Sequence, residues 1–169
     1  MVRFIVLILA TLSLSVAAEG TASERGDLTR LGEVRVVVED SNSHMKEMGL
    51  TEEALKKEVV GLLLGKLPRV AIDNTAKSYV YVNVNVLYGT VESRKRYYFG
   101  NVMVQVKQPV INKNTGQEIS AAVWGLSHVL TGPPNEASEH VFGSLNTILN
   151  KLAADWYQDN PVKHKDQGS

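Results

Sequence analysis

The stretch that most constrains the fold is residues 79–87, which read Tyr-Val-Tyr-Val-Asn-Val-Asn-Val-Leu. Valine occupies every even position from 80 to 86, whereas the odd positions from 79 to 85 carry tyrosine or asparagine. Because successive side chains of a strand point to opposite faces, this segment predicts a strand with one β-branched face and one polar-aromatic face. Such a strand belongs in a sheet that apolar elements cover on one side only.

The first part of the chain has the layout of a cleaved secretory signal. Arg3 supplies a positive charge, residues 4–16 form a mostly apolar run, and Val16, Ala17 and Ala18 fit the small-residue cleavage site. The run is short for a membrane span, and a short N-terminal anchor helix is the alternative. No cysteine follows it, which excludes a lipid anchor of the bacterial lipoprotein type. We expect the mature protein to begin at Glu19 and to be exported, to the periplasm or the cell exterior.

Composition narrows the classes of site that the chain can carry. There is no cysteine, so disulfides and thiolate metal sites are impossible. Packing of the core must therefore stabilise the fold without such cross-links. The 18 basic residues balance the 18 acidic ones, so no overall field attracts nucleic acid. The length suits one domain with a substantial core.

The pattern of apolar residues and turn formers predicts the element order β-α-β-β-β-α. Residues 19–30 are expected to be a flexible leader, residues 31–161 a single domain, and residues 162–169 a disordered tail. The expected strands cover about residues 31–39, 79–87, 97–108 and 118–130. One helix is expected to begin at the N-cap Thr51 and to end near Gly65 and Pro68, and the last to begin after the cap Asn135.

This order predicts an α+β fold, a two-layer sandwich in which two helices cover one face of a four-stranded mixed sheet. The strand–helix–strand step makes the first two strands parallel through a right-handed connection, and the last three form an antiparallel meander. Both helices are needed to cover the valine face, so the opposite face is expected to stay open. The strand at residues 118–130 allows two assignments, because residues of either parity include apolar side chains.

The sequence holds little that suggests catalysis. It lacks the Gly-x-Ser-x-Gly pattern of a nucleophile elbow, a glycine-rich phosphate loop, and histidines at metal-ligand spacing. His44, Met45 and Met48 offer imidazole and thioether groups that suit copper, with ordinary loop and core residues as the alternative. We therefore expect no catalytic residue, no metal and no cofactor, and a protein that is not an enzyme.

Two features are candidate partner-binding sites. On the open face, Tyr79, Tyr81, Met103 and, in one assignment of the fourth strand, Trp124 would form an apolar-aromatic patch. The alternative is that this patch is modest, or is hidden by the leader or the tail.

The second candidate is a run of three cations followed by two aromatics at the start of the third strand, namely Arg94, Lys95, Arg96, Tyr97 and Tyr98. This run would suit an anionic partner, and a solvated hairpin end is the alternative.

The layout resembles a group of small uncharacterised exported bacterial α+β proteins. The shared features are Gly49, Leu50 and Thr51 at a helix start, the valine strand at residues 80–86, Trp124, and the Trp-Tyr-Gln-Asp-Asn-Pro ending at residues 156–161. The arrangement is also similar in outline to envelope assembly modules such as the amino-terminal domain of TolB and the lipopolysaccharide-transport lipoprotein LptE. Proteins of the LptE type carry a lipidated cysteine that this chain lacks. The resemblance implies a non-catalytic role in the envelope and transfers no functional residue.

Together these features predict a non-enzymatic envelope or periplasmic module for binding or assembly that uses its open sheet face. Its partner would be an envelope protein or an anionic envelope component, with no nucleic acid and no membrane-spanning segment after signal cleavage. The alternative is a carrier of a small molecule or lipid, with a cavity between the helices and the sheet.

Overall fold

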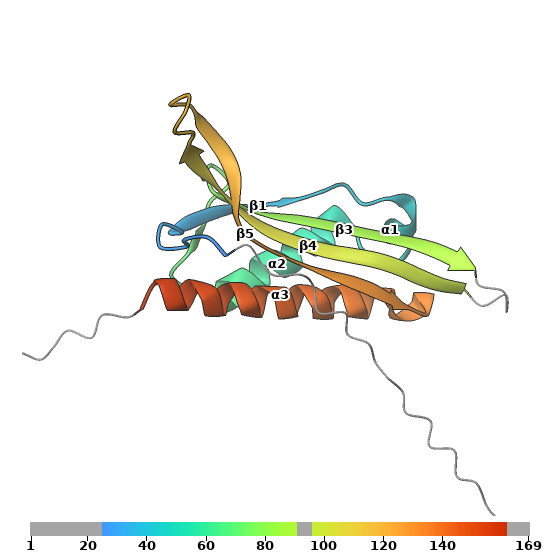
Figure 1. Ribbon diagram of the computed structural model, residues 1–169. Coiled ribbons are helices and arrows are strands. Elements are labelled where there is room, and N and C mark those ends of the chain that lie inside the picture. Colours follow the sequence, from blue (N-terminus) through green and yellow to red (C-terminus); the bar gives the residue numbers. More distant parts are fainter. Residues whose placement is uncertain (1–24, 91–95, 162–169) are drawn as a thin grey trace, which may run out of the picture.

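The computed structural model describes residues 25–90 and 96–161 of the 169-residue chain. It is an α+β sandwich, as predicted, with one mixed sheet of strand order β2-β1-β3-β4-β5 (Figure 1). The elements are β1 (Glu33–Val38), α1 (Ser43–Glu47), α2 (Glu52–Lys66), β2 (Ala71–Ile72), β3 (Tyr79–Thr90), β4 (Arg96–Ile111), β5 (Glu118–Gly132), a 3₁₀ turn η1 (Pro134–Glu136) and α3 (Ala137–Asp159).

The strand pairing confirms the predicted topology. β1 runs parallel to β3, β3 runs antiparallel to β4, and β4 runs antiparallel to β5. The sheet has five strands instead of four because β2, only two residues long, pairs in parallel with the outer side of β1.

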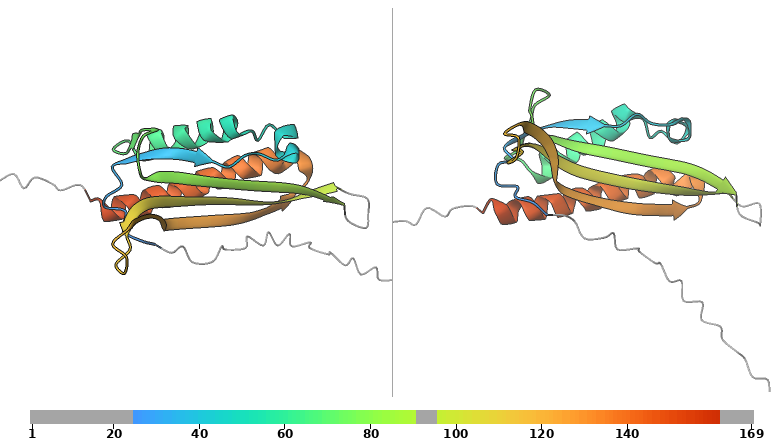
Figure 2. Two further views of the ribbon diagram at one scale, coloured as in Figure 1. Left: turned by 90° about the horizontal axis from the view of Figure 1, so that it is seen from above. Right: turned by 45° about the horizontal axis from the view of Figure 1, so that its top comes forward.

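The valine rows face the helices, as the alternation predicts. Val80, Val82, Val84 and Val86 of β3 are buried, and so are the even-numbered valines of β4 at positions 102, 104 and 106. α2 and α3 lie side by side beneath this face (Figures 1 and 2). The hydrophobic effect on this one face therefore provides the main driving force for the fold.

The start of α2 is as predicted. The Thr51 side chain accepts a hydrogen bond of 3.2 Å from the N–H of Ala54, which satisfies one of the free amides at the helix N-terminus. The short helix α1 was not predicted. Asn42 caps it by accepting a 2.9 Å hydrogen bond from the N–H of Met45, whose side chain is buried.

The prediction that Asn135 caps the last helix is wrong. Asn135 lies inside η1, and α3 begins two residues later, at Ala137. Glu136 occupies the N-cap position without a side-chain hydrogen bond to the helix. Pro133 and Pro134 fix an extended turn and then a 3₁₀ turn before the α-helical hydrogen bonding starts.

A β-bulge decides which face each residue of β5 occupies. The register between β4 and β5 shifts between Val106 and Lys107, where Trp124 pairs with Val106 but Ala122 pairs with Lys107. Val123 is the extra residue, so the side-chain alternation is interrupted there. From Trp124 to Leu130 the even-numbered residues lie on the helix side.

The position expected for Trp124 on the open face is therefore wrong. Its indole is buried against α3, where Nε1 donates a 2.9 Å hydrogen bond to Asp155. No simple alternation could show this, because the bulge reverses the parity of β5 one residue earlier.

The expectation that residues 19–30 form a leader outside the fold does not hold for residues 25–30. Leu28 is fully buried in the core, and the N–H of Gly26 donates a hydrogen bond to the carbonyl of Val123 on β5. The folded domain therefore begins at least six residues earlier than predicted. The proposed signal sequence and the tail at residues 162–169 lie outside the described residues.

Beyond the bulge, the β4–β5 hairpin rises from the side of the sheet away from the helices (Figure 1). Glu118 in this hairpin accepts a 2.9 Å charged hydrogen bond from Lys77, and the Ser120 hydroxyl donates to the Tyr79 hydroxyl at 3.3 Å. Within residues 25–90 and 96–161, the helices are too short or too polar to cross a membrane.

Candidate functional site

The open face of the sheet, meaning the side opposite α2 and α3, is formed by the odd-numbered residues of β3 and β4. In the register of these strands Tyr79 lies opposite Lys107, Tyr81 opposite Gln105, and Asn83 opposite Met103. The structure thus places three of the predicted patch residues, Tyr79, Tyr81 and Met103, on the open face, each partly exposed.

The two tyrosines are surrounded by charged groups. The Arg35 guanidinium lies 4.8 Å from the centre of the Tyr79 ring, and the Lys107 ammonium lies 4.2 Å from the centre of the Tyr81 ring. The Tyr81 hydroxyl donates a hydrogen bond to the carboxylate of Glu39. Cation–π contacts and hydrogen bonds of this kind hold the rings in place. This half of the open face is therefore a polar surface with charges of both signs, and not the apolar-aromatic patch that was expected.

The apolar side chains gather on the other half of the open face. Leu87 is 59% exposed, Phe99 54% and Val129 73%, and Leu87 lies directly opposite Phe99. Phe99 and Val129 are diagonal neighbours on β4 and β5, because Phe99 pairs with Thr131 and Asn101 pairs with Val129. We call Leu87, Phe99 and Val129 the apolar patch.

Gly89 makes room for the ring of Phe99. A Cβ atom at position 89 would lie 3.1 Å from Cε2 of that ring, closer than nearly all real contacts. The aromatic ring thus covers a glycine backbone that would otherwise face water, and it stays on the surface.

Sequence reasoning missed the apolar patch because it assigned faces only at residues 79–86 and 102–107, although Leu87 and Phe99 lie within the ranges expected for the two strands. β3 continues to Thr90 and β4 begins at Arg96, so both strands are longer than predicted. Extending the alternation would have placed Leu87 and Phe99 on the open face together. Val129 could not be placed from the sequence because of the bulge.

The basic-aromatic run is only partly described. Arg94 and Lys95 lie outside the described residues. Arg96 is exposed opposite Thr90, and Tyr97 is partly exposed opposite Gly89, so both lie at the end of the sheet that carries Leu87 and Phe99.

Tyr98 does not belong to this surface. It is fully buried on the helix side, and its hydroxyl lies 2.5 Å from Nδ1 of His140 on α3. Burial, together with the negative charge of Glu136, raises the pKa of Tyr98. Tyr98 therefore packs the core and cannot supply contact area to a partner.

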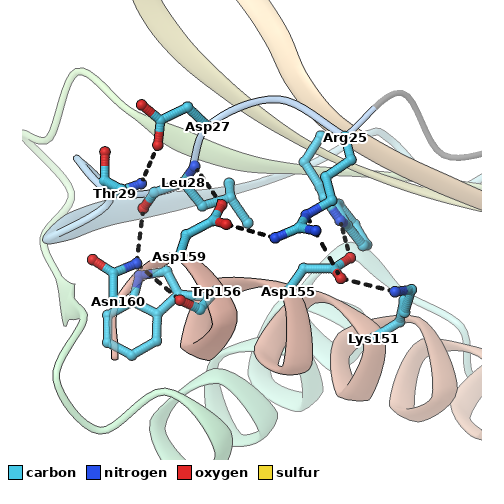
Figure 3. Close-up of polar contacts among 10 residues, drawn as sticks. Arg25, Asp27, Leu28, Thr29, Lys151, Asp155, Trp156, Asp159 and Asn160 are labelled. Atoms are coloured by element: carbon cyan, nitrogen blue, oxygen red, sulfur yellow. Dashed lines mark hydrogen bonds and ion pairs between the residues drawn. The ribbon is translucent and has the colours of Figure 1, made fainter. Parts of the chain in front are cut away.

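A polar cluster ties the start of the described chain to the end of α3 (Figure 3). Arg25 forms a 2.5 Å ion pair with Asp159, and the N–H of Leu28 donates a 3.0 Å hydrogen bond to the same carboxylate. The amide of Asn160 donates to the carbonyl of Leu28 at 3.2 Å. We call these contacts the N-terminal clasp.

Asp155 is the buried acid of this cluster. Its carboxylate accepts hydrogen bonds from Trp124 at 2.9 Å and from Lys151 at 2.8 Å, and the Arg25 guanidinium lies 3.9 Å away. Burial on its own would raise the pKa of Asp155. The hydrogen bonds from Lys151 and Trp124 and the charges of Lys151 and Arg25 outweigh burial and leave the pKa below its ordinary value. Asp155 is thus held ionised and acts as a structural anchor.

An open groove of about 620 Å³ lies beside the N-terminal clasp. Its lining includes Arg30, Arg69 and Trp156, and the Arg69 guanidinium lies 4.7 Å from the centre of the Trp156 ring. Arg69 also donates a 2.8 Å hydrogen bond to the carbonyl of Asn160. This groove is formed at the C-terminal end of α3, and not between the helices and the sheet, where a carrier would need its cavity.

Two histidines contact hydroxyl groups between α3 and the sheet. Nδ1 of His128 lies 2.8 Å from Oγ of Ser144, and His140 contacts Tyr98 as described above. Ser144 and Tyr98 are both buried, so a substrate could not reach either hydroxyl. Among the described residues there is no group of three or more histidines and carboxylates that could hold a metal ion.

Comparison with known proteins finds similarity only among solved structures, and at low sequence identity. No protein-family model matches the chain, and no curated protein matches it. Among solved structures, the chain is similar to the PelC dodecamer from Paraburkholderia phytofirmans, with 15% identity and a TM-score of 0.47 over 78% of this chain and 95% of that one.

Two further similarities are to proteins of other bacteria. One is to a minor lipoprotein from Acinetobacter baumannii, with 10% identity and a TM-score of 0.34 over 76% of this chain and 89% of that one. The other is to a putative neuraminyllactose-binding hemagglutinin homologue from Helicobacter pylori, with 14% identity and a TM-score of 0.27 over 83% and 88%. In each case the likeness lies in the layout of the fold.

Proposed function

We propose that this chain is a non-enzymatic binding module of the bacterial envelope that holds a partner protein on its open sheet face. The observation that carries the proposal is the apolar patch of Leu87, Phe99 and Val129 on a face that α2 and α3 leave uncovered. Exposed apolar side chains gathered on one surface and bordered by polar groups are typical of protein interaction sites.

The surroundings of the apolar patch favour a protein over a small molecule. The same face presents the asparagines of β3 and the partly exposed Tyr79 and Tyr81, each ring beside a cation. Tyrosine and asparagine offer contact area and hydrogen bonds at low entropic cost, so such a face suits a second polypeptide. The exported location is part of this proposal and rests on the signal-like residues 1–18.

Site-specific photocrosslinking in the native cells tests the proposal. A photoreactive phenylalanine at position 99 or 87 should form the same adduct of defined size, whereas one at position 64 should not. Leu64 is a matched control because it is 54% exposed but belongs to α2 on the helix side of the molecule. A Phe99→Asp substitution should remove the adduct formed at position 87.

Two results would contradict the proposal. One is equal crosslinking at positions 64 and 99, which would show contact without a preferred face. The other is the absence of any adduct at positions 87 and 99 in cells that contain folded protein.

A further inference from the structure

β5 leaves a long free edge on the sheet. It is the last strand in the order β2-β1-β3-β4-β5, so one of its two sides has no partner strand in the described part of the chain. Its residues 124–132 read Trp-Gly-Leu-Ser-His-Val-Leu-Thr-Gly, without a carboxylate, a lysine, an arginine or a proline. Charges, prolines or a short length normally keep a natural edge strand from pairing with another chain. Residues 124–132 of β5 have none of these protections.

The backbone groups that face the free edge follow from the hydrogen bonds of the inner strands. The N–H of Glu39 on the β1 side donates to the carbonyl of Val82, so even-numbered residues of β3 turn their backbone groups towards β1. Odd-numbered residues of β3 therefore bond to β4, and the even-numbered residues of β4 turn to β5. The hydrogen bond from the N–H of Asn112 to the carbonyl of Gln117 agrees with this parity.

In β5 beyond the bulge, even-numbered residues thus bond to β4 and odd-numbered residues turn outward. The carbonyl of Val123 points outward in this way, because it accepts the hydrogen bond from the N–H of Gly26. The outward N–H and C=O groups that follow belong to Gly125, Ser127, Val129 and Thr131.

Apolar side chains flank this edge on both faces of the sheet. On the helix side Leu126, Leu130 and, from α3, Phe142 pack against the core but remain partly exposed. On the open face Val129 is largely exposed. An added strand would therefore gain backbone hydrogen bonds and would also bury apolar surface above and below the sheet.

We propose that a second copy of this chain pairs with this edge. The two β5 strands would run antiparallel about a two-fold axis near His128, which joins two five-stranded sheets into one. In this register Leu126 of each copy lies opposite Leu130 of the other on the helix side. On the open face Ser127 of each copy lies opposite Val129 of the other, with outward backbone groups facing each other.

Self-pairing is favoured because the strand supplies what its own edge requires, an uncharged segment with apolar residues at alternate positions. The opposite edge of the sheet is β2, which is only two residues long. Each copy thus offers one long edge, and the assembly closes at two copies instead of growing into a filament. Residues 19–24, which precede Arg25 in the sequence, match this edge less well because they contain two glutamates and no large apolar side chain.

The test is the oligomeric state of the mature full chain, measured by analytical ultracentrifugation over a concentration series. The wild type should show a concentration-dependent dimer. Val129→Lys and Ser127→Pro should each raise the dimer dissociation constant at least about tenfold, by placing a charge on the edge or removing an outward N–H. Ile119→Lys is the matched control and should leave the dimer dissociation constant unchanged. Ile119 is also exposed on β5, but it lies outside residues 124–132.

Hydrogen exchange separates self-pairing from other occupants of the edge. In the proposed dimer, protection of the Gly125, Ser127, Val129 and Thr131 amides rises with protein concentration. Protection that is independent of concentration, with a dimer that appears only when residues 19–24 are deleted, would show that this segment covers the edge and would overturn the proposal. A monomer at every concentration, or a dimer unaffected by either substitution, would overturn it too. Ser127 lies outside the apolar patch, so failure here is distinguishable from failure of the open-face function.

Discussion

Trp124 and Asp155 join the edge strand of the sheet to the last helix through a buried hydrogen bond. Nε1 of Trp124 donates to Oδ2 of Asp155 at 2.9 Å, and Asp155 is only 2% exposed. The other carboxylate oxygen accepts from Lys151 and lies near Arg25. One buried acid thus holds β5, α3 and the start of the described chain together.

We expect Asp155→Asn and Trp124→Phe each to destabilise the protein. Loss of one partner leaves a buried polar group or a charge unsatisfied, which costs about 1–3 kcal/mol. Because the two side chains share a hydrogen bond, the double variant should lose less than the sum of the single losses. Urea unfolding of the wild type, the two single variants and the double variant measures this coupling. Asp27→Asn, which changes an exposed carboxylate, serves as the control. Strictly additive losses would mean that the bond contributes nothing.

Stability should depend on pH through the same carboxylate. The pKa of Asp155 is lower in the folded protein than in the unfolded chain, so the folded state favours the ionised form. Its contribution is therefore fully present above the unfolded pKa of about 4 and is lost as the pH falls through the lower folded pKa. The stability difference between wild type and Asp155→Asn should shrink across this acidic range. A difference that stays constant from neutral to acidic pH would rule out this linkage.

Val84→Asp should be far more damaging than Asn85→Asp. Val84 lies beneath the helices, where an unpaired carboxylate costs about 3 kcal/mol or more, whereas the exposed Asn85 leaves the new charge in water within about 0.5 kcal/mol. Denaturant midpoints of the two variants compare the two faces of one strand directly. Similar losses at both positions would show that the open face is covered in solution.

Replacing the cations at positions 94, 95 and 96 by alanine should weaken binding to anionic envelope material. Three adjacent positive charges attract an anionic surface over about 8 Å at physiological salt, so the effect should fade as salt is added. Cosedimentation with anionic vesicles at two salt concentrations measures it, and stability should change by less than about 1 kcal/mol. A variant with alanine at Lys46, Lys57 and Lys113, all exposed elsewhere, removes the same charge as a control. If the wild type does not bind at low salt, the run is a solvated turn.

The mature protein should begin at Glu19, because Val16 and Ala18 suit the small-residue positions of a signal cleavage site. The intact mass of protein recovered from its native compartment measures this directly. A mass that includes residues 1–18 would favour the anchor helix over the cleaved signal.

The sequence predicted those parts of the fold in which local pattern and tertiary packing agree. The alternation at residues 80–86 identified the buried face of β3, and Thr51 identified the start of α2. It also showed that one face of the sheet lacks a helix. These signals are local, since side-chain alternation and an N-cap depend on a few neighbouring residues.

The remaining features depend on contacts between distant residues. The bulge beside Trp124 exists only in the register of two strands, and the buried Leu28 is held by hydrogen bonds to Asp159 and Asn160, more than 130 positions away. Leu87 and Phe99 become neighbours only through the pairing of β3 with β4. The predicted patch residues Tyr79, Tyr81 and Met103 lie on the open face, whereas its most exposed apolar side chains gather at the other end of that face.

The N-terminal clasp sets the order in which the fold can be completed. Arg25 and Asp159 are 134 positions apart, so the first described residue cannot be fixed until α3 has left the ribosome and, if the chain is exported, has crossed the membrane. Until then Leu28 lacks its hydrogen bonds to Asp159 and Asn160. α3 therefore closes the domain, and a chain truncated before Asp155 would lack the carboxylates to which Arg25 and Leu28 dock.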